Sequence, residues 1–503
     1  MSQPPLVAHP HGATGADAGH PRGLYVLFFT EMWERFSYYG MRALLVLFMV
    51  DAVRHGGMGL SDRTATAIYG LYTAAVYLAA LPGGWIADRF LGAQRAVWFG
   101  GIVIASGHFT LAVPSTQTFY LGLLLVVLGT GLLKPNVSAM VAELYPEGGA
   151  RRDAGFSIFY MGINLGALLG PLACSALGEK VNWHYGFAAA GVGMVAGLAQ
   201  YGFSGKQLGA AGRLPGHPEG ARLRDWLLLA GLVLGVVTVT GLSLSGVLRI
   251  DAAALASAAK YVIAAVGAVY LASVFLFFDL NATEKRRVAA IVILLLASAM
   301  FWAGLEQAGS SLNLFAERYT QRAFLRVTIP TGWFQALAPL FVISLAPVTA
   351  SLWMALARRN RDLSIPAKFA WGLLLLAGGF LVMAIASHFV AAGQKVWPTW
   401  LITTYLLHTL GELCLSPIGL SSVTKLAPKR LVGQLMGAWF LATSLGNLIA
   451  GLIAGSFSVD ALHQMPQRYL QIVLTTAGTG LLLLIFARPI RKLMTEAGGT
   501  RSD

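Results

Sequence analysis

Apolar residues along this chain gather in blocks of about 20, and the short segments between the blocks carry most of the charged residues. A helix of about 20 apolar residues crosses the hydrocarbon core of a bilayer, whereas the strands of a membrane barrel alternate apolar and polar positions. The blocks therefore predict an all-α membrane protein. We expect fourteen spans, at residues 24–50, 64–87, 95–113, 118–143, 155–178, 183–203, 225–247, 257–279, 288–316, 332–357, 367–390, 399–425, 431–456 and 466–490.

Composition agrees with this prediction. Hydrophobic residues make up 56% of the 503 residues and charged residues only 12%, too few for the surface of a soluble protein of this length. In a soluble protein the net charge of +14 would suggest a nucleic-acid partner, but basic membrane loops explain it here, and we expect no nucleic acid to bind. Cys174 and Cys414 lie in different blocks and are too few for a disulfide framework or a zinc site.

Basic residues in the loops orient the predicted spans. They gather in alternate loops, as Arg89, Arg95, Arg151, Arg152, Lys206, Arg213, Arg222, Arg224, Lys285, Arg286, Arg287, Arg358, Arg359, Arg361, Lys429, Arg430, Arg491 and Lys492. The positive-inside rule predicts that these loops and both termini are cytoplasmic. Residues 1–22 contain no apolar stretch and are interpreted as a disordered cytoplasmic tail rather than a signal peptide. One basic loop, with Arg318, Arg322 and Arg326, falls on the outside.

The chain contains an internal repeat. Two prolines that lie eleven residues apart in and after the fourth span recur in and after the twelfth, and a Leu-Gly step follows each pair in the next span. These are Pro135 and Pro146 with Asn164-Leu165-Gly166, and Pro417 and Pro428 with Ser444-Leu445-Gly446. Two similar halves build a central site in many membrane carriers. We therefore divide the chain into a tail (1–22), an N-terminal six-helix bundle (23–204), a linker with two extra membrane helices (205–287), a C-terminal six-helix bundle (288–492) and a C-terminal tail (493–503).

Charged residues lie inside the first predicted span, where each one costs several kcal/mol and marks a functional site by default. A helix turns by about 100° per residue, so the polar residues of this span share one face. They are Glu31, Glu34, Arg35, Tyr38 and Arg42. A solvated turn near the membrane surface is the alternative, but Arg42 lies about three turns deeper than Glu31.

Further charges lie in other spans, at Lys134, Glu306 and Glu412. The whole set contains four carboxylates and three cations, so one carboxylate lacks a cation even when three pairs form. Desolvation raises the pKa of an unpaired carboxylate, which can then take up a proton near neutral pH. A static set of structural ion pairs is the alternative, but proton coupling better explains why so many charges are buried.

Aromatic residues accompany these charges, at Tyr38, Tyr39, Tyr77, Trp302 and Trp439. Phenol and indole groups combine an apolar body with a polar donor, which suits a site that accepts varied side chains. Core packing or anchoring at the membrane surface is the alternative for each of them.

The loop after the second span, at 84–95, combines glycines with Asp88 and Arg89. Glycine permits a tight turn, and the charge of Asp88 is favoured opposite a helix N-terminus. We interpret the loop as a latch that holds one conformation closed. A simple cluster of charges in an inner loop is the alternative.

This loop resembles the loop between helices 2 and 3 of the major facilitator superfamily, and other motifs resemble the proton-dependent oligopeptide transporter (POT/PTR) family of that superfamily, in particular its bacterial members. The motifs are Glu31-x-x-Glu34-Arg35-Phe-x-Tyr38-Tyr39-Gly40, Gly131-Leu-Leu-Lys134-Pro135-Asn136, Phe159-Tyr160-Met161-Gly162-Ile163-Asn164-Leu165-Gly166, Phe301-Trp302 with Glu306-Gln307, and Gly411-Glu412-Leu413 with Ser416-Pro417. The resemblance runs from about residue 24 to residue 490. It implies two six-helix bundles with two extra helices between them.

The resemblance also implies how protons would be coupled. Glu31, Glu34 and Arg35 would form the proton-coupling motif. Glu34 or its neighbour would pair with Lys134. Glu306 would pair with Arg42 and offer a second protonation site.

Peptide binding follows from the same resemblance. Arg42 and Lys134 would hold the peptide carboxylate, whereas Glu412, assisted by Asn164, would hold the amino group. The site would also include Ser416, with Tyr38, Tyr39, Tyr77, Trp302 and Trp439 lining the pockets for side chains. The expected partners are di- and tripeptides, protons and membrane lipid, with no cofactor besides the proton, for a monomer in the inner membrane of a bacterium.

The chain departs from the family pattern at Ala338, where many relatives carry an asparagine whose amide could contact the peptide amino group. It also has no histidine in the second span, since His55 precedes that span, so histidine-dependent coupling is not expected. His108 and His408 lie in spans and are interpreted as packing or polar-cavity residues.

Other functions fit part of the pattern. A drug/proton antiporter has the same number of spans and the same loop, but it does not require opposite charges at the spacing of a zwitterion. A carrier of nitrate-like anions would not need Glu412. A receptor that binds peptides without transporting them is also compatible. A membrane enzyme is not expected, because the sequence contains no HExxH, no GxSxG and no cluster of His or Cys.

Overall fold

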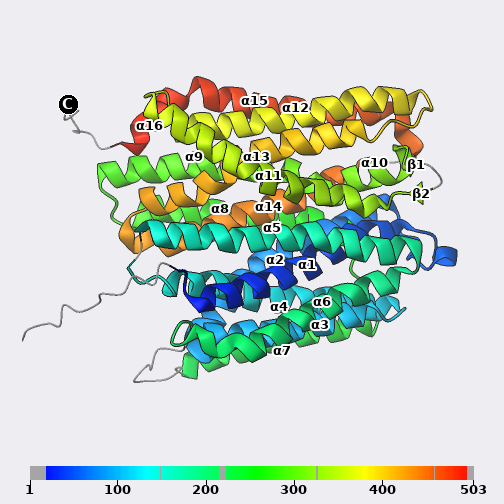
Figure 1. Cartoon of the computed structure of the whole chain (residues 1–503), viewed down its shortest axis with the longest axis horizontal. Helices are drawn as coiled ribbons and strands as arrows, with labels where there is room; N and C mark the ends of the chain where they lie inside the picture. Colours follow the sequence, from blue (N-terminus) through cyan, green and yellow to red (C-terminus); the bar gives the residue numbers. More distant parts are fainter. Residues whose placement is uncertain (1–18, 148, 214–222, 325–326, 458, 496–503) are drawn as a thin grey trace, which may run out of the picture.

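The computed structural model describes residues 19–147, 149–213, 223–324, 327–457 and 459–495, and most of these residues are helical (Figure 1). The N-terminal half consists of α1 (Arg22–Val50), α2 (Asp62–Ile86), α3 (Ala93–Leu111), α4 (Thr116–Glu143), α5 (Gly149–Lys180) and α6 (Trp183–Ser204). The two extra helices are α7 (Leu223–Leu244) and α8 (Ala252–Phe277). The C-terminal half consists of α9 (Ala282–Leu305), α10 (Ser311–Tyr319), α11 (Leu337–Arg358), α12 (Ile365–Ala391), α13 (Thr399–Leu426), α14 (Val432–Ala454), α15 (Met465–Ile485) and α16 (Ala487–Met494).

Short elements connect the long helices. They are η1 (Val53–His55), the π-helical η2 (Ala87–Leu91), η3 (Gly205–Leu208), η4 (Glu306–Gly309), η5 (Thr331–Ala336), η6 (Lys429–Leu431) and η7 (Val459–Gln464). Strands β1 (Ala323–Phe324) and β2 (Val327–Thr328) form a small antiparallel hairpin, with Ala323 opposite Thr328. Most of the predicted tail at 1–22, Arg222, Arg326 and the last eight residues lie outside the described residues.

Twelve helices in the described part of the chain are long and apolar enough to cross a membrane. Helices α1 and α3 occupy the two remaining predicted spans, 24–50 and 95–113. Helix α1 carries the charged face described above. Helix α3 has 19 residues, and at 1.5 Å per residue it reaches about 28 Å, close to the thickness of the hydrocarbon core.

Three predicted spans are not continuous α-helices. The span at 288–316 is α9 followed by the 3₁₀ segment η4 and then α10, and the span at 332–357 begins as the 3₁₀ segment η5. The last span ends at Ile485, and α16 follows as a separate helix. Apolar residues flank each break, and the polar run at η4, residues 306–311, was interpreted as charge within a continuous span. Irregular backbone inside a membrane is tolerated where it is enclosed by protein or lines a cavity.

Equivalent helices of the two halves pack in the same way. Helix α1 packs on α5 and α6 as α9 packs on α14 and α15, and α3 packs on α4 as α12 packs on α13. The repeated glycines lie at two of these contacts. A Cβ atom on Gly166 would collide with the carbonyl oxygen of Met32 on α1, and one on Gly446 would lie 2.7 Å from the carbonyl oxygen of Ala299 on α9. The sequence repeat therefore corresponds to matching close approaches of helices.

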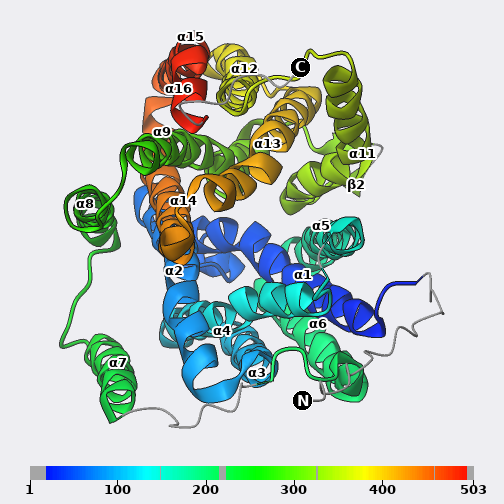
Figure 2. The same ribbon diagram turned by 90° about the vertical axis from the view of Figure 1, so that its left-hand side faces the viewer.

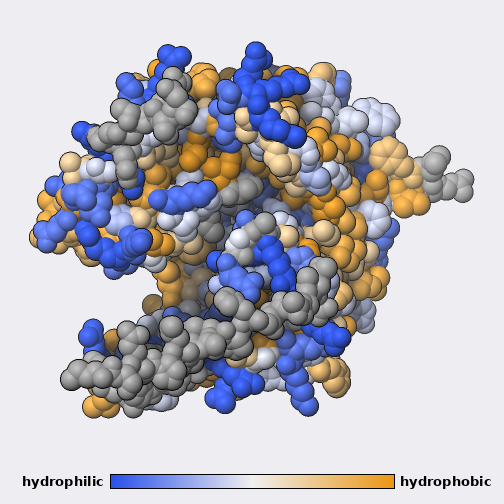
Figure 3. All heavy atoms as spheres, turned by 60° about the vertical axis from the view of Figure 1, so that its left-hand side comes forward, coloured by the Kyte–Doolittle hydropathy of each residue, from blue (hydrophilic) through white to orange (hydrophobic). Residues whose placement is uncertain are grey.

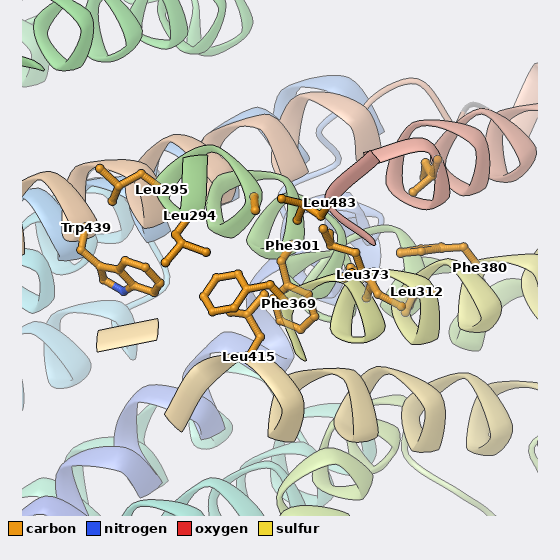
Figure 4. Packing of buried hydrophobic residues seen from close by; sticks show 14 of the residues in the cluster. Leu294, Leu295, Phe301, Leu312, Phe369, Leu373, Phe380, Leu415, Trp439 and Leu483 are labelled. Atoms are coloured by element: carbon orange, nitrogen blue, oxygen red, sulfur yellow. The ribbon is translucent and has the colours of Figure 1, made fainter. Parts of the chain in front are cut away.

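Each half has its own apolar core. In the C-terminal half, Phe301, Phe369, Phe380 and Leu415 pack together with Trp439 (Figure 4). The N-terminal half has separate clusters, one of which includes the fully buried Tyr69, Phe119 and Phe187. Lipid is as apolar as these side chains, so close packing rather than exclusion from water holds the helices of each half together.

Helices α7 and α8 lie outside both halves (Figure 2). Helix α8 packs on α14 and α2 and buries Ala256, Ile263 and Val274. No residue of α7 is buried, and at its start the Trp226 ring lies 4.7 Å from that of Phe90.

The two ends of the helical bundle differ in charge. We call the end where α1 begins, with the loops 88–95 and 205–213, the basic end. The end where α1 finishes is called the far end. Hydrophilic side chains gather at the basic end (Figure 3).

Candidate functional site

A cavity of about 120 Å³ lies between the two halves. Its walls come from α1, α2 and α5 on one side and from α9, η4, η5, α11 and α13 on the other. Nine residues from the sequence analysis line it: Tyr39, Arg42, Tyr77, Asn164, Trp302, Glu306, Ala338, His408 and Glu412. Residues that are hundreds of positions apart in the chain therefore converge on one site, as the repeat predicts.

Glu31, Glu34 and Arg35 form a buried cluster on α1, two turns before Arg42. The Nε atom of Arg35 lies 3.2 Å from Glu31 Oε1 and is in still closer contact with Glu34 Oε2. The three side chains are at most 4% exposed. Glu31 Oε2 and Glu34 Oε1 have no hydrogen-bond partner in the described chain. One guanidinium therefore serves two carboxylates, and a net buried charge of this kind is costly.

An ion pair between Arg42 and Glu306 connects the two halves. Arg42 Nη1 and Glu306 Oε2 are 3.2 Å apart, and both side chains are 8% exposed. Glu306 is placed by the break in its helix, because it is the first residue of η4. Arg42 Nε has no hydrogen-bond partner among the described residues. The pair expected from the sequence is thus present. The Nε–H group of Arg42 remains available to donate a hydrogen bond.

Lys134 and Glu412 carry opposite charges on opposite halves. Glu412 lines the cavity from α13, and no described residue forms a hydrogen bond or ion pair with it. The Nζ atom of Lys134 lies 4.1 Å from the centre of the Tyr77 ring, which is part of the cavity wall. Arg35 contacts one oxygen of each carboxylate on α1, and no ion pair joins Lys134 to Glu34 or Glu31 among the described residues. The expected pairing of Lys134 therefore stays a prediction.

Comparison with known proteins settles the family. A sequence model described as the POT family matches residues 94–468. The chain belongs to the POT family. It is 43% identical to the peptide transporter YePEPT of Yersinia enterocolitica over 498 residues, which cover 96% of this chain and 97% of that protein. It is 36% identical to a di-/tripeptide transporter of Lactococcus lactis, over 95% of this chain and 97% of the relative.

A solved structure supports the same assignment. The crystal structure of a peptide transporter POT in complex with sulfate superposes with a TM-score of 0.88 at 41% sequence identity. The match covers 96% of this chain and 97% of that chain. The fold is therefore that of the POT family, two six-helix bundles with two extra helices.

Aromatic residues of this POT-family chain are divided between the cavity and the cores. Tyr39, Tyr77 and Trp302 line the cavity. Tyr38 is 5% exposed and stacks on Tyr72 in the core of the N-terminal half, with the ring centres 6.2 Å apart. The expectation that all the aromatic residues would line pockets is thus corrected for Tyr38.

Trp439 and Ser416 are also absent from the cavity wall. Trp439 is 5% exposed in the core of the C-terminal half, with its ring 6.4 Å from Phe369 (Figure 4). Gly419 on α13 makes room for this indole, since a Cβ atom there would collide with it. The Oγ atom of Ser416 is buried and has no hydrogen-bond partner in the described chain. Trp439 is thus a packing residue in this conformation, whereas the role of Ser416 in the site stays a prediction.

The sequence analysis did not identify two polar residues of the cavity wall, Gln335 and Tyr405. Gln335 precedes Ala338 by three residues, which is one turn of the 3₁₀ segment η5. Its Nε2 atom is buried without a hydrogen-bond partner in the described chain. The helical spacing from Ala338 could have indicated Gln335. His408 precedes Glu412 by four residues and lines the cavity too, one of the two alternatives set out for it.

The predicted latch residues lie in η2. Asp88 is exposed, and no described residue forms a hydrogen bond or ion pair with it. Arg89 Nη1 lies 3.6 Å from Asp225 Oδ2 at the start of α7. The latch stays a prediction.

Ion pairs close the far end of the site. Arg318 at the end of α10 donates two hydrogen bonds to Asp62 at the start of α2, at 2.7 and 2.8 Å. Arg322 lies 3.7 Å from Glu179 at the end of α5. Arg318 and Arg322 belong to the one basic loop that was expected on the outside. Both therefore pair with carboxylates of the other half.

Backbone groups reinforce this closure. Glu179 accepts hydrogen bonds from the backbone N–H groups of Thr331, at 2.6 Å, and Gly332, at 2.8 Å. A carboxylate is favoured at the start of a helical segment, where these N–H groups have no partner within the helix. The halves are therefore locked together where η5 begins.

Proposed function

We propose that the chain imports di- and tripeptides together with protons by alternating access. The observation that carries this proposal is a cavity between two halves that is lined by Arg42 on one half, with Lys134 beside the lining residue Tyr77, and by the unpaired carboxylate of Glu412 on the other half. A peptide in water is a zwitterion, so it needs one wall of each sign. Relatives named as peptide transporters support the proposal.

The residues divide the substrate between them. Arg42 and Lys134 on the N-terminal half would bind the peptide carboxylate, and Glu412 on the C-terminal half would bind the amino group. Asn164 donates its Nδ2 hydrogen to the carbonyl oxygen of Tyr160, at 2.9 Å, which leaves its side-chain oxygen free to accept from that amino group. Tyr39, Tyr77 and Trp302 would offer apolar surface with polar edges to varied side chains.

Proton coupling would operate through the two buried arginines. A proton on Glu306 would release Arg42, which could then bind the peptide carboxylate. A proton on Glu31 or Glu34 would remove the net charge of the cluster around Arg35. Only a ligand with unequal affinity for two conformations can shift their populations, and the proton would be that ligand. Loss of the proton would restore the ion pairs and expel the peptide.

The conformation described here would be the one that faces the cytoplasm. The far end is closed by the pairs of Arg318 and Glu179 across the halves. The positive-inside rule makes the basic end cytoplasmic, together with both termini. We place the protein in the inner membrane of a bacterium as a monomer, with membrane lipid around it.

Uptake of labelled dialanine into proteoliposomes tests the proposal. We expect accumulation that requires an inward proton gradient and stops when a protonophore is added. Glu412→Gln should lose most of this uptake, because a neutral amide pairs weakly with an ammonium group. Glu284→Gln is the matched control, since Glu284 lies outside the cavity at the start of α9. Binding without accumulation would support a receptor, and uptake of nitrate or efflux of drugs in place of dialanine transport would support the other carriers.

A further inference from the structure

The two extra helices enclose a second hollow, a groove of about 620 Å³ against the N-terminal half. Its walls come from α2, α4, the last turns of α7, the loop 246–250 and the start of α8. Most of its lining is apolar, as at Leu71, Leu124, Val239 and Leu255. The molecule is hollowed on the side where α7 and α8 stand (Figure 3). The central cavity shares none of these residues.

One end of the groove is positively charged. Arg249 is the charged residue among those that line it, and no described residue forms an ion pair with Arg249. The nearby Asp251 is engaged elsewhere, because it accepts a hydrogen bond from the Ala253 N–H at 2.8 Å and caps α8. The groove therefore presents an arginine whose charge is not balanced by the described chain.

The start of α4 lies at the same end. Thr116 and Gln117 line the groove, and the Ser115 side chain does not cap the helix. The first N–H group of the helix that finds a backbone acceptor is that of Phe119, which donates to the Ser115 carbonyl oxygen. The preceding N–H groups and the helix dipole favour an anion at this position.

Tyr72 belongs to the wall of the groove, but its hydroxyl group is enclosed by the protein. Its side chain is 4% exposed, and the ring stacks on Tyr38 in the core of the N-terminal half. The charge of Arg249 and the start of α4, rather than this hydroxyl group, therefore indicate the chemistry of the occupant.

We propose that this groove binds an anionic phospholipid. The phosphate group lies between Arg249 and the start of α4, and an acyl chain follows the apolar wall. The site is in the outer leaflet, since the α7–α8 loop is at the far end. The lipid fills the space between the extra helices and the bundle, which explains how α7 is held although it buries no residue of its own.

Native mass spectrometry of the purified full chain tests this proposal, with phosphatidylglycerol, phosphatidylethanolamine or inorganic phosphate added in detergent. We expect selective retention of phosphatidylglycerol by the wild type. Arg249→Gln should reduce its occupancy about fivefold, because one basic residue near a membrane surface contributes about that factor. Lys395→Gln is the matched control, since Lys395 is an exposed cation in another far-end loop.

A second variant fills the groove itself. Ser243→Phe places a ring against the groove from α7, where no residue is buried, so folding of the bundle should be unaffected. We expect this variant to retain no bound phosphatidylglycerol, whatever the length of the acyl chains of the added lipid. It should still elute as a single species in size-exclusion chromatography. Equal retention of the two lipids, full retention in Arg249→Gln, or equally tight binding of inorganic phosphate alone would overturn the proposal.

Discussion

At the scale of single residues, the two buried arginines of α1 pair with buried carboxylates. Arg35 serves Glu31 and Glu34, whereas Arg42 reaches Glu306 on the other half. The resemblance to the family predicted the pair of Arg42 with Glu306, but not that Arg35 contacts both Glu31 and Glu34. The pairing depends on which side chains the folded helices bring within about 4 Å of one another.

Changing Glu31→Gln tests the cluster around Arg35. We expect accumulation driven by the proton gradient to fall to the level measured without a gradient, because the amide cannot exchange a proton. Counterflow exchange of peptide, which needs no net proton movement, should continue. Both are measured with labelled dialanine in proteoliposomes. Full gradient-driven uptake by the Glu31→Gln variant would contradict the assignment of Glu31 to proton coupling.

Changing Gln335→Ala tests a cavity residue that the sequence analysis missed. The buried Nε2 group of Gln335 has no partner in the described chain, so we expect it to donate to bound peptide. Loss of one such hydrogen bond, worth about 1 kcal/mol, should raise the KM for dialanine about fivefold with little change in kcat. Gln394→Ala in an exposed loop is the control, and an unchanged KM in Gln335→Ala would contradict the role.

At the scale of elements, the breaks in the helices matter more than their lengths. Glu306 starts η4, and Gln335 lies in η5, so two cavity residues come from 3₁₀ segments within predicted spans. A regular α-helix would rotate each following residue by about 100°, and the tighter segment rotates it further. The break therefore decides which residues reach the cavity.

Two glycines of α14 offer a matched test of the packing between elements. A Cβ atom on Gly446 would lie 2.7 Å from the carbonyl oxygen of Ala299, whereas one on Gly433 would have no neighbour within 4 Å. Gly446→Ala should cost about 1–3 kcal/mol of stability through overpacking. Gly433→Ala should be neutral or slightly stabilising. Thermal unfolding in detergent measures both, and equal effects would mean that the close approach of α14 and α9 is not important.

At the scale of the whole molecule, the far-end contacts select one arrangement of the two halves. Each half has its own apolar core, so the halves can move as units while the contacts between them change. The bidentate pair of Arg318 with Asp62 and the contacts of Glu179 belong to the arrangement described here. Breaking them should favour the arrangement that is open at the far end.

Changing Arg318→Gln tests this closure. Hydrogen bonds between charged groups contribute about 1.5–3 kcal/mol, so the population open at the far end should rise about tenfold or more. Spin labels on cysteines introduced at Val53 and Trp397, both exposed at the far end, report the opening as a longer distance. The native cysteines are buried and should not be labelled.

Two further variants make this test specific. Exchanging the charges, with Asp62→Arg and Arg318→Asp together, should restore the short distance. Arg54→Gln removes an exposed cation at the same end that is in no ion pair with described residues, and it should change nothing. A distance that stays short in Arg318→Gln would show that other contacts hold the far end closed.

The sequence by itself determined the membrane-spanning helices, because the thickness of a bilayer fixes the length of an apolar block. It also determined the charged face of α1, because helix geometry fixes which residues share a face. It named nine residues of the cavity, most of them through the resemblance to a family. The tertiary structure alone decided the rest: that Trp439 packs in a core, that Arg35 contacts Glu34, and that Gln335 faces the cavity. These outcomes depend on where helices break and how closely they pack, which involve residues distant in the chain.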